Sequence, residues 1–583
     1  MSQLHSAFDS IQFQILYGWV ADHIRTQPLA SLATLVIVFL LGFSLRHLIT
    51  SSPYPNIDGP PNKKLMIGHL FDIFSPRGIA FHDNLQDTYG SVCKVNGFLG
   101  KEDLYVSDPR FLHEVLVKEV ETVFPHPQVL HDFMNISFGP GLLAVSGEQH
   151  RMQRKMLNPV FTPKHMKSLN AFKVTTFTAV AQNMKAAIMK DLDGAPLKEI
   201  DMLEWCSATA LELIGQAGLG HSFGTLHGQE SAFIRAAKNY NPAWTPLSPV
   251  GPIFQLIYNL RPRAIRRKIA EWIPHQNVQI LKEIIDVQDA QARMILTRKQ
   301  EEVNGQDSSE LEEMNDIITV LLKANMKADE RDRLPHDQLL GQINTLLFAA
   351  YETTSGALAR TLQILSQNPD IQDRLRAELQ ATPEAPTYDE LHSLPYLDAL
   401  CRETLRVFPP VPLMERYAAR DWIVPLRYPI KGKDGKDIRE IHVKKGTHIY
   451  TALRQANRET WGEDADQFRP ERWLEKLPDS VSEARTSGVY SSIWSKGVHV
   501  GPFAILKAPV LILGLFQWIQ ILTARAQNYI VHAGQDLQVC PWRKQNFMDY
   551  DHDYGAVPGR YGELLGRGQP ASHAFEGVTG IKA

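Results

Sequence analysis

An acid and two alcohols stand together in the middle of an otherwise apolar helical segment. The segment reads INTLLFAAYETTSGALARTLQIL, follows Asp337 and is expected to end before Pro369. Polar groups in a buried helix need a partner or a purpose. The Thr353 hydroxyl can bond back to a carbonyl three or four residues earlier, and Glu352 beside it is suited to relay protons to a ligand. The alternative is a polar helix face that meets a neighbouring helix.

A second group of charged residues lies further along the chain. Glu403 and Arg406 are three residues apart in LDALCRETLRVFPP, a helix that the two prolines stop. Such a pair alone is a weak signal, typical of a surface contact worth roughly 0.2–0.5 kcal/mol. A third motif, FRPERW at residues 468–473, follows at a suitable distance and contains Arg472. The three motifs together are hard to explain by coincidence.

Up to Tyr490 the chain resembles the cytochrome P-450 family in its membrane-anchored eukaryotic form. The resemblance implies a mainly α fold with a minor β-sheet portion, preceded by a single N-terminal transmembrane helix. It also implies that Glu352 and Thr353 deliver protons to a bound oxygen species. Ala350 stands where the family more often has glycine.

The resemblance further implies residues that bind or frame a haem. His150 and Arg154, one turn apart in GEQHRMQRKMLNPVF, match the helix that holds a haem propionate. Arg416, in PLMERYAARD, matches another propionate partner. A buried charge network is expected to shape the haem-binding core. The residues expected around the haem are His150, Arg154, Arg416, Glu403, Arg406 and Arg472.

The iron ligand of the family is missing from its expected place. The family motif, roughly FxxGxRxCxG, does not follow SGVYSSIW, and the chain reads SKGVHVGPFAIL instead. His499 lies near the place of the ligand, although an incidental loop histidine is the simpler interpretation. Cys540, in LQVCPWRK, is the one later cysteine and lacks the surrounding motif. The sequence therefore leaves the metal ligand unknown.

The missing cysteine leaves three hypotheses open. A cysteine thiolate pushes electron density onto haem iron and favours oxygen–oxygen cleavage, whereas imidazole gives globin- or peroxidase-like haem. The first hypothesis is a haem-dependent monooxygenase. The second is a catalytically dead, haem-free, membrane-anchored homologue, or a mis-spliced product of such a gene, with altered sequence from about residue 491. The third is a histidine-ligated haem protein without monooxygenation.

Under the first hypothesis, the chain inserts one oxygen atom from O2 into a lipophilic small molecule, in secondary metabolism or xenobiotic oxidation. The resemblance implies electrons from NADPH through a membrane-bound NADPH–cytochrome P-450 reductase. A basic helix face at Arg151, Arg154 and Lys155 is suited to dock it, or is simply solvated. Residues 241–262, rich in aromatics and proline, either dip into a membrane surface or pack as a loop. The sequence does not identify the substrate.

The expected domain organisation begins with a membrane anchor. The stretch Leu29–Leu45 has no charged residue and is just long enough to cross a bilayer. Basic residues are denser after it than before it, which places the main domain in the cytosol, at the endoplasmic reticulum. The sequon at Asn135 would then go unused. The expected segments are 1–28 (N-terminal), 29–49 (transmembrane anchor), 50–64 (proline-rich linker), 65–525 (cytochrome P-450-like domain, aberrant from about 491) and 526–583 (atypical tail).

The amino-acid composition limits the class of protein and the kinds of partner and metal site to be expected. The 583 residues are 44% hydrophobic and 21% charged, a globular balance, and the net charge of -3 gives no hint of a nucleic-acid partner. Four cysteines without a CxxC pattern argue against a disulfide framework or a zinc site. Short strand-like runs occur at Leu104–Val106 and His442–Val443. The charged stretch Lys299–Asp316 is expected to be a solvated loop.

Overall fold

The computed structural model describes residues 52–484, apart from 63, 65, 76, 163–164, 166–175, 193–199, 229–231, 259–262, 307–313 and 384–387. The predicted segments 1–28 and 29–49, the tail 526–583, His499 and Cys540 lie outside the described residues. Among the helices of the described ranges, none is both long and apolar enough to cross a membrane.

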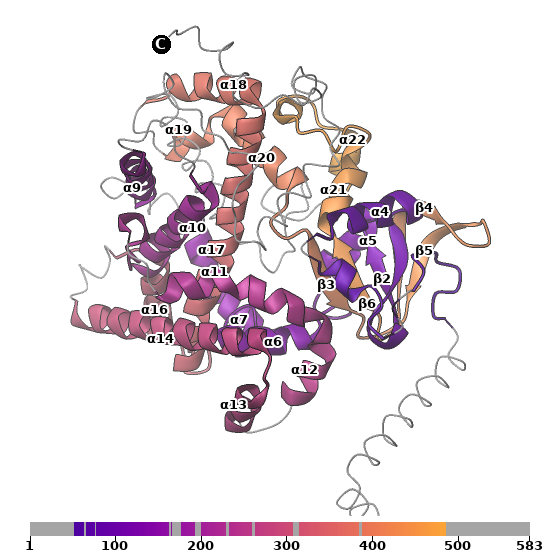
Figure 1. The fold of residues 1–583 in the computed structure, drawn as a ribbon, viewed down its shortest axis with the longest axis horizontal. Coiled ribbons are helices and arrows are strands. Elements are labelled where there is room, and N and C mark those ends of the chain that lie inside the picture. Colours follow the sequence, from indigo (N-terminus) through magenta and orange to yellow (C-terminus); the bar gives the residue numbers. More distant parts are fainter. Residues whose placement is uncertain are drawn as a thin grey trace, which may run out of the picture.

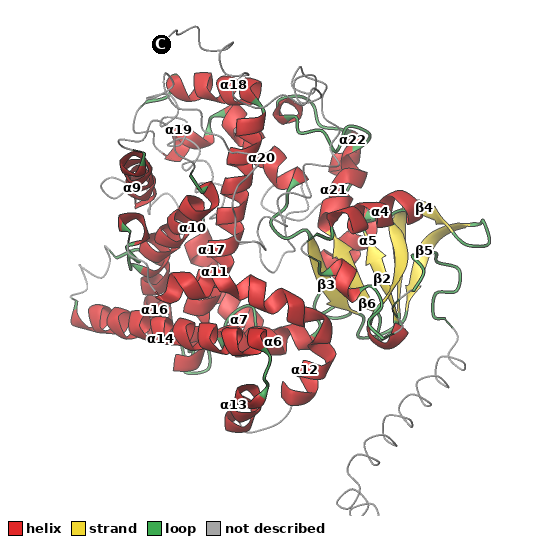
Figure 2. Ribbon diagram, viewed as in Figure 1, coloured by secondary structure: helices red, strands yellow, loops and turns green. Residues whose placement is uncertain are grey.

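Helices form most of the described chain, and the strands gather at one side of the molecule (Figures 1 and 2). The predicted mainly α fold with a minor sheet is confirmed. The main helical elements are α3 (Leu70–Ile73), α4 (Ile79–Tyr89), α5 (Pro109–His113), α6 (Gln128–Phe138), α7 (Gly147–Leu157), α9 (Thr176–Asp191), α10 (Met202–Leu213), α11 (Ala232–Trp244), α12 (Gly251–Tyr258), α13 (Arg263–Trp272), α14 (Gln276–Gly305), α16 (Ile317–Lys327), α17 (His336–Gln367), α18 (Pro369–Gln380), α19 (Tyr388–His392), α20 (Pro395–Val407), α21 (Leu453–Trp461) and α22 (Asp479–Glu483).

The strands form a four-stranded sheet and a separate hairpin. The larger sheet has the order β1–β2–β6–β3, with β2 parallel to β6 and the other pairs antiparallel. The hairpin pairs β4 with β5. The two predicted strand-like runs lie inside β2 and β5. The bounds are β1 (Val92–Asn96), β2 (Glu102–Val106), β3 (Leu413–Tyr417), β4 (Trp422–Lys431), β5 (Asp437–Val443) and β6 (His448–Ala452).

The long helix α17 runs through the middle of the helical part (Figure 1). Its apolar side chains point in several directions, and most of its side chains, polar ones included, are buried, with α10, α14 and α20 as the main neighbours. A helix that is apolar all round belongs in the interior, as observed. It begins at His336 and ends at Gln367, before Pro369, so the predicted helix and its end are confirmed.

A close approach between two glycines fixes α17 against the segment that follows α6. A Cβ atom added to Gly341 of α17 would lie 2.9 Å from the Cα of Gly141 and closer still to its nitrogen. Only a residue without a side chain allows this main-chain contact. The contact holds the end of α6, and therefore the side chains that α6 presents, at a fixed distance from α17.

Replacing Gly341 by alanine is expected to lower the free energy of unfolding by about 1–3 kcal/mol, because the added methyl group must displace main chain. Gly356 on the same helix is the matched control, since no atom lies within 4 Å of a Cβ added there. Alanine at Gly356 is expected to stabilise the helix by about 0.5–1 kcal/mol. Denaturant unfolding of the purified variants measures both, and equal effects would contradict the close contact.

The prediction of a solvated loop from Lys299 onward is wrong for its first part. Helix α14 continues to Gly305, and Lys299 is buried in it. The Lys299 ammonium lies 3.1 Å from a carboxylate oxygen of Asp316 and 3.0 Å from one of Glu302. A buried lysine is retained because it is paired. The charge pattern alone did not reveal that partner.

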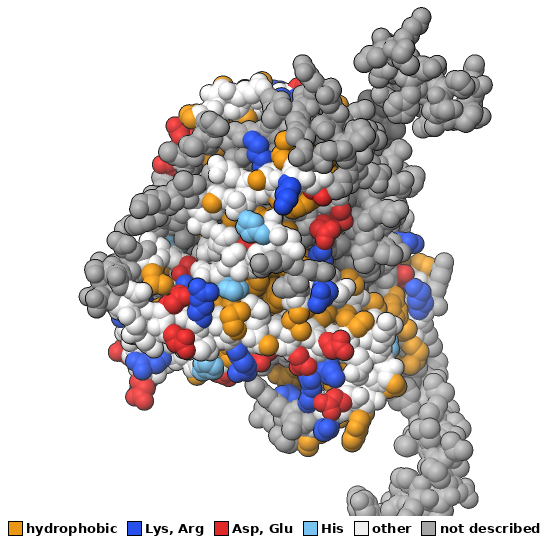
Figure 3. Space-filling view, turned by 60° about the vertical axis from the view of Figure 1, so that its left-hand side comes forward, with side chains coloured by type: hydrophobic (Ala, Val, Ile, Leu, Met, Phe, Trp, Pro, Cys, Tyr) orange, Lys and Arg blue, Asp and Glu red, His pale blue; other side chains and the backbone are white. Residues whose placement is uncertain are grey.

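Basic and acidic side chains are interspersed with apolar ones on the face of the molecule seen in Figure 3. That face therefore presents no extended field of one charge sign, the feature that steers polyanions to a protein surface.

Candidate active site

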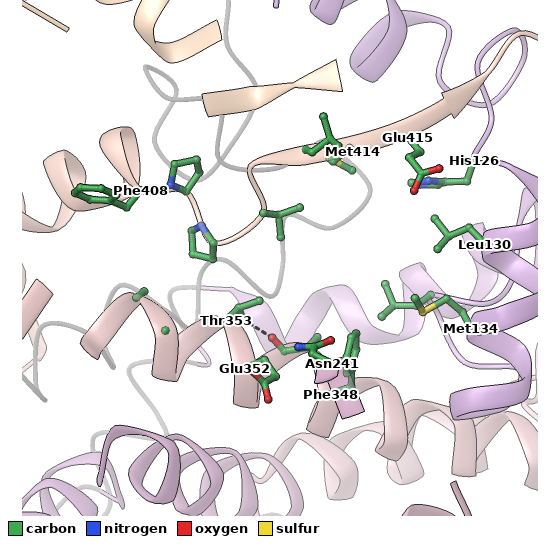
Figure 4. A pocket seen from close by; sticks show the side chains of 18 of the residues that line it. His126, Leu130, Met134, Asn241, Phe348, Glu352, Thr353, Phe408, Met414 and Glu415 are labelled. Atoms are coloured by element: carbon green, nitrogen blue, oxygen red, sulfur yellow. Dashed lines mark hydrogen bonds between the residues drawn. The ribbon is translucent and has the colours of Figure 1, made fainter. Parts of the chain in front are cut away.

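A cavity of about 550 Å³ lies between α17, α6 and the segment that joins α20 to β3. Figure 4 shows Phe408 at one end and His126, Leu130 and Met134 at the other, with Glu352 and Thr353 on α17. The lining residues are His126, Leu130, His131, Met134, Leu143, Asn241, Phe348, Ala349, Glu352, Thr353, Gly356, Ala357, Arg360, Phe408, Pro409, Pro410, Val411, Leu413, Met414 and Glu415.

Glu352 and Thr353 of α17 line the cavity, whereas the neighbouring Thr354 is buried and does not. The Thr353 hydroxyl donates to the Ala349 carbonyl at 2.5 Å, so the predicted back-bond is confirmed. Because the hydroxyl hydrogen is used in this way, the lone pairs of the oxygen remain able to accept from a ligand or water. Glu352, the preceding residue, also lines this cavity wall. Their role in proton delivery stays a prediction.

The second motif forms a buried ion-pair network, not a surface contact. Glu403 has no exposed surface, and Arg406 is 1% exposed. The Arg406 guanidinium donates to both Glu403 carboxylate oxygens at 2.8 Å. Arg472, also buried, donates to Glu403 at 3.0 Å and to Asp464 at 3.1 Å. The charges are thus paired out of water, where a lone charge would be costly.

Main-chain groups complete this network. Arg406 donates to the carbonyls of Ala465 and Gln467, and Glu403 accepts from the Arg469 main-chain nitrogen. The network ties α20 to the FRPERW segment, more than sixty residues away in sequence. Glu403, Arg406 and Arg472 do not line the cavity. They support it indirectly, by holding α20 and the FRPERW segment together.

Arg416 is a buried cation that does not itself line the cavity but contacts His126, which does. No part of it is exposed, and its guanidinium donates to the Glu415 carbonyl at 2.8 Å and contacts Nδ1 of His126 at 2.7 Å. Its Nε has no hydrogen-bond partner among the described residues. Burial lowers the pKa of Arg416 to about 9. The neighbouring Glu415 carboxylate, which lies 2.8 Å from a ring nitrogen of His448, offsets part of this lowering.

The arrangement around Arg416 therefore favours an anionic ligand. A buried guanidinium with a free donor beside a cavity is stabilised when a carboxylate reaches it. His126, on the cavity wall, shares the same contact. Haem carries two carboxylates, so this observation fits the predicted propionate partner.

His150 and Arg154 both lie on α7, as predicted, but neither lines the cavity. The Arg154 Nε donates to Asn158 at 3.1 Å, and burial lowers the pKa of Arg154. Their predicted contact with a haem propionate stays a prediction.

Several cavity residues were missed by sequence reasoning. His126 and His131 stack edge to face at 5.7 Å, and Asn241 reaches the cavity from α11. Arg360 lies over the Phe408 ring at 4.4 Å and donates to Gln363 at 2.8 Å. These residues come from separate segments and form no local motif. Nothing in the sequence indicated that these separate polar residues lie around one cavity.

Three of the four cysteines are excluded as cavity ligands. Cys93, Cys206 and Cys401 are fully buried in hydrophobic clusters, and none of them lines the cavity. Burial raises the pKa of each thiol, which disfavours thiolate. The described residues contain no cluster of histidine, cysteine and acidic side chains that could hold a metal ion. His499 and Cys540 lie outside the described residues.

Comparison with known proteins gives one consistent result. A sequence model described as Cytochrome P-450 matches residues 59–485. The chain is 41% identical to Cytochrome P-450 monooxygenase 91 of Postia placenta over 467 residues, 78% of this chain and 85% of that protein. It is 35% identical to a ganoderic acid synthetase of Ganoderma lucidum over 481 residues, 80% of this chain and 86% of that protein.

Proposed function

The chain belongs to the cytochrome P-450 family of monooxygenases, and on that premise we propose that it is a haem-dependent enzyme that oxidises a lipophilic small molecule. One oxygen atom of O2 enters the substrate, and the other leaves as water with two protons and two electrons from NADPH. The observation that carries the proposal is one cavity that combines an apolar lining and the Glu352–Thr353 pair, with the buried cation Arg416 behind its His126 wall.

Haem fits the cation side of this cavity. Arg416 and His126 would hold a haem carboxylate, because the free Nε of Arg416 needs an acceptor. Bound haem would supply the reductive activation of dioxygen, which no side chain can perform. The protein would supply orientation, exclusion of water and protons. Thr353 is placed to accept a hydrogen bond, with the Glu352 carboxylate beside it as a proton store.

The lining of the cavity supports a lipophilic substrate. Leu130, Met134, Phe348, Val411 and Met414 present apolar surface from four separate segments. Burial of apolar substrate surface against such a lining contributes about 25 cal/mol per Å². Asn241 adds one polar group from α11, which is suited to orient a substrate oxygen.

None of the three described cysteines lines the cavity. Thiolate ligation, which monooxygenation favours, therefore points to Cys540. The haem-free homologue and the His499-ligated protein are the competing hypotheses. The match to the family model ends at residue 485 and leaves the choice to experiment.

The remaining parts of the proposal concern partners and location. Electrons would come from NADPH through a membrane-bound reductase. Arg151 and Lys155 are exposed on α7 and suited to meet an acidic partner, although each lies 3.6 Å from an acidic side chain of this chain. An anchor at residues 29–49 would hold the protein in the endoplasmic reticulum membrane with its main domain in the cytosol.

The carbon monoxide difference spectrum of the full 583-residue chain, expressed in membranes with haem and reductase, tests the proposal. We expect bound haem with a thiolate-type band, and loss of that band in Cys540→Ser. Incorporation of label from ¹⁸O2 into a lipophilic product is the matching activity. A folded chain without haem would overturn the proposal in favour of the inactive homologue. An imidazole-type band that His499→Ala removes would overturn it in favour of the third hypothesis.

Arg416→Met is expected to have opposite effects on the two forms of the chain. Haem affinity should fall by about tenfold, because a charge-assisted hydrogen bond is lost. The haem-free chain should become more stable, because a fully buried cation that makes no ion pair with a carboxylate of the described residues is removed. Haem titration and denaturant unfolding measure the two effects. Arg420→Met, at an exposed arginine over Trp422, is the control and should change neither; unchanged haem affinity in Arg416→Met would exclude the propionate role.

A further inference from the structure

A second cavity, of about 560 Å³, lies away from the proposed active site. It is bounded by the end of α6, by α11 and α12, by α13, and by the first turns of α14. The lining residues are Phe133, Asn135, Ile136, Gly139, Pro140, Trp244, Leu247, Phe254, Tyr258, Arg266, Arg267, Ile269, Ala270, Ile273, His275, Val278, Leu281, Lys282 and Ile285. None of these residues lines the first cavity.

Packed aromatic rings separate the two cavities. On α6, Met134 lines the active-site cavity and the adjacent Phe133 lines the second cavity. On α11, Asn241 lines the active-site cavity and Trp244 lines the second cavity. The Phe133 and Trp244 rings stack on each other with an interplanar angle of 19°. A closely packed aromatic partition makes the second cavity a separate site.

The interior of the second cavity is apolar. Helix α13 contributes Ile269 and Ala270, Ile273 follows directly after it, and α14 contributes Leu281 and Ile285. At one edge, the Asn135 side-chain nitrogen donates to the Tyr258 hydroxyl at 3.1 Å. That bond links α6 to α12.

The charged residues that line the second cavity are all basic: Arg266, Arg267 and Lys282. Arg267 is neutralised by Asp286, whose carboxylate oxygens lie 2.8 and 2.6 Å from it. Arg266 donates to the Tyr258 carbonyl at 2.9 Å and lies over the Tyr258 ring, with no carboxylate partner among the described residues. Lys282 makes no ion pair within the described part of the chain. Two positive charges therefore remain uncompensated at an apolar cavity.

We propose that the second cavity binds a single-chain amphiphile with a carboxylate head, the chemical class of long-chain fatty acids. The hydrocarbon chain would occupy the apolar interior, where its burial removes it from water. The carboxylate would lie at Arg266 and Lys282, where a charge-assisted hydrogen bond compensates its desolvation. This site does not depend on haem or on the proposed oxidation.

The test is equilibrium binding of cis-parinaric acid, a fluorescent polyunsaturated carboxylate, to the full chain in phosphatidylcholine nanodiscs, with empty nanodiscs subtracted. Its methyl ester, which lacks the charge, is the matched ligand. We expect one site for the acid and about fivefold to tenfold weaker binding of the ester. Equal binding of acid and ester would overturn the proposed role of the cations.

Four variants locate the site. Ala270→Trp fills the second cavity and should abolish binding, while Lys282→Gln should weaken it about fivefold to tenfold. Lys268→Gln, on the outer side of α13, and Gly356→Phe, which fills the active-site cavity, should leave binding unchanged. Binding that survives Ala270→Trp, or that Gly356→Phe removes, would overturn the proposal. Circular dichroism of each variant confirms that it is folded, so that lost binding is not lost structure.

Discussion

Glu403→Ala is expected to destabilise the fold by about 3–5 kcal/mol, the cost of leaving buried charges without their partner. Arg406 would lose its carboxylate partner, and Arg472 would keep Asp464 as its one carboxylate partner among the described residues. The Arg469 main-chain nitrogen and the Trp473 indole nitrogen would each lose an acceptor as well. Because typical domains are stable by about 5–15 kcal/mol, one substitution would remove a large share of the total.

Denaturant unfolding of the haem-free chain measures this loss without reference to activity. Asp398→Ala is the matched control, since Asp398 pairs with Arg402 on the same helix α20 in a partly exposed contact at 2.6 Å. An exposed pair of this kind is worth about 0.2–1 kcal/mol. If the two substitutions lower the free energy of unfolding by the same amount, the buried network does not stabilise the fold more than an exposed ion pair does. Glu403→Gln should fall between them, since it keeps the shape and loses the charge.

The same network shows which features of the fold could be predicted from the sequence. The spacing of Glu403 and Arg406 predicted a pair on one helix face, but the spacing is equally compatible with the surface. Its burial depends on Trp461, Asp464 and Trp473, which lie 55 to 70 residues further along the chain. Family resemblance predicted the buried network correctly, whereas helix periodicity alone did not.

Some features of the cavity could be predicted from the sequence, and others could not. Residues on a single helix, such as Glu352 and Thr353, were found because a polar group inside an apolar helix is visible in the sequence. The contact of Arg416 with His126 joins positions 290 residues apart and leaves no local trace. Lys299 was misjudged for the same reason, because its partner Asp316 lies on a different segment. Long-range pairing of polar groups was the information that the sequence lacked.

Thr353→Val is expected to lower product formation in the haem-loaded chain by about 10²-fold, a typical contribution of a group that positions or transfers a proton. The substitution keeps the β-branched shape and removes the hydroxyl that lies on the cavity wall. The Ala349 carbonyl keeps its main-chain bond within α17, so the fold should tolerate the change. Consumption of NADPH should continue, because electron delivery does not use this hydroxyl. The ratio of product formed to NADPH consumed is therefore the informative measurement.

Thr361→Val separates a catalytic effect from a structural one. Thr361 lies two turns further along α17, and its hydroxyl donates to the Ala357 carbonyl at 2.8 Å, the same back-bond as at Thr353. Thr361 is buried and does not line the cavity. Loss of this hydroxyl should change stability by a similar amount and leave the ratio of product to NADPH unchanged.

Thr353→Ser should restore most of the ratio, since it returns the hydroxyl without the methyl group. An equal fall in both valine variants would mean that Thr353 acts through the shape of the helix, and the proton role assigned to the Glu352–Thr353 pair would have to be abandoned.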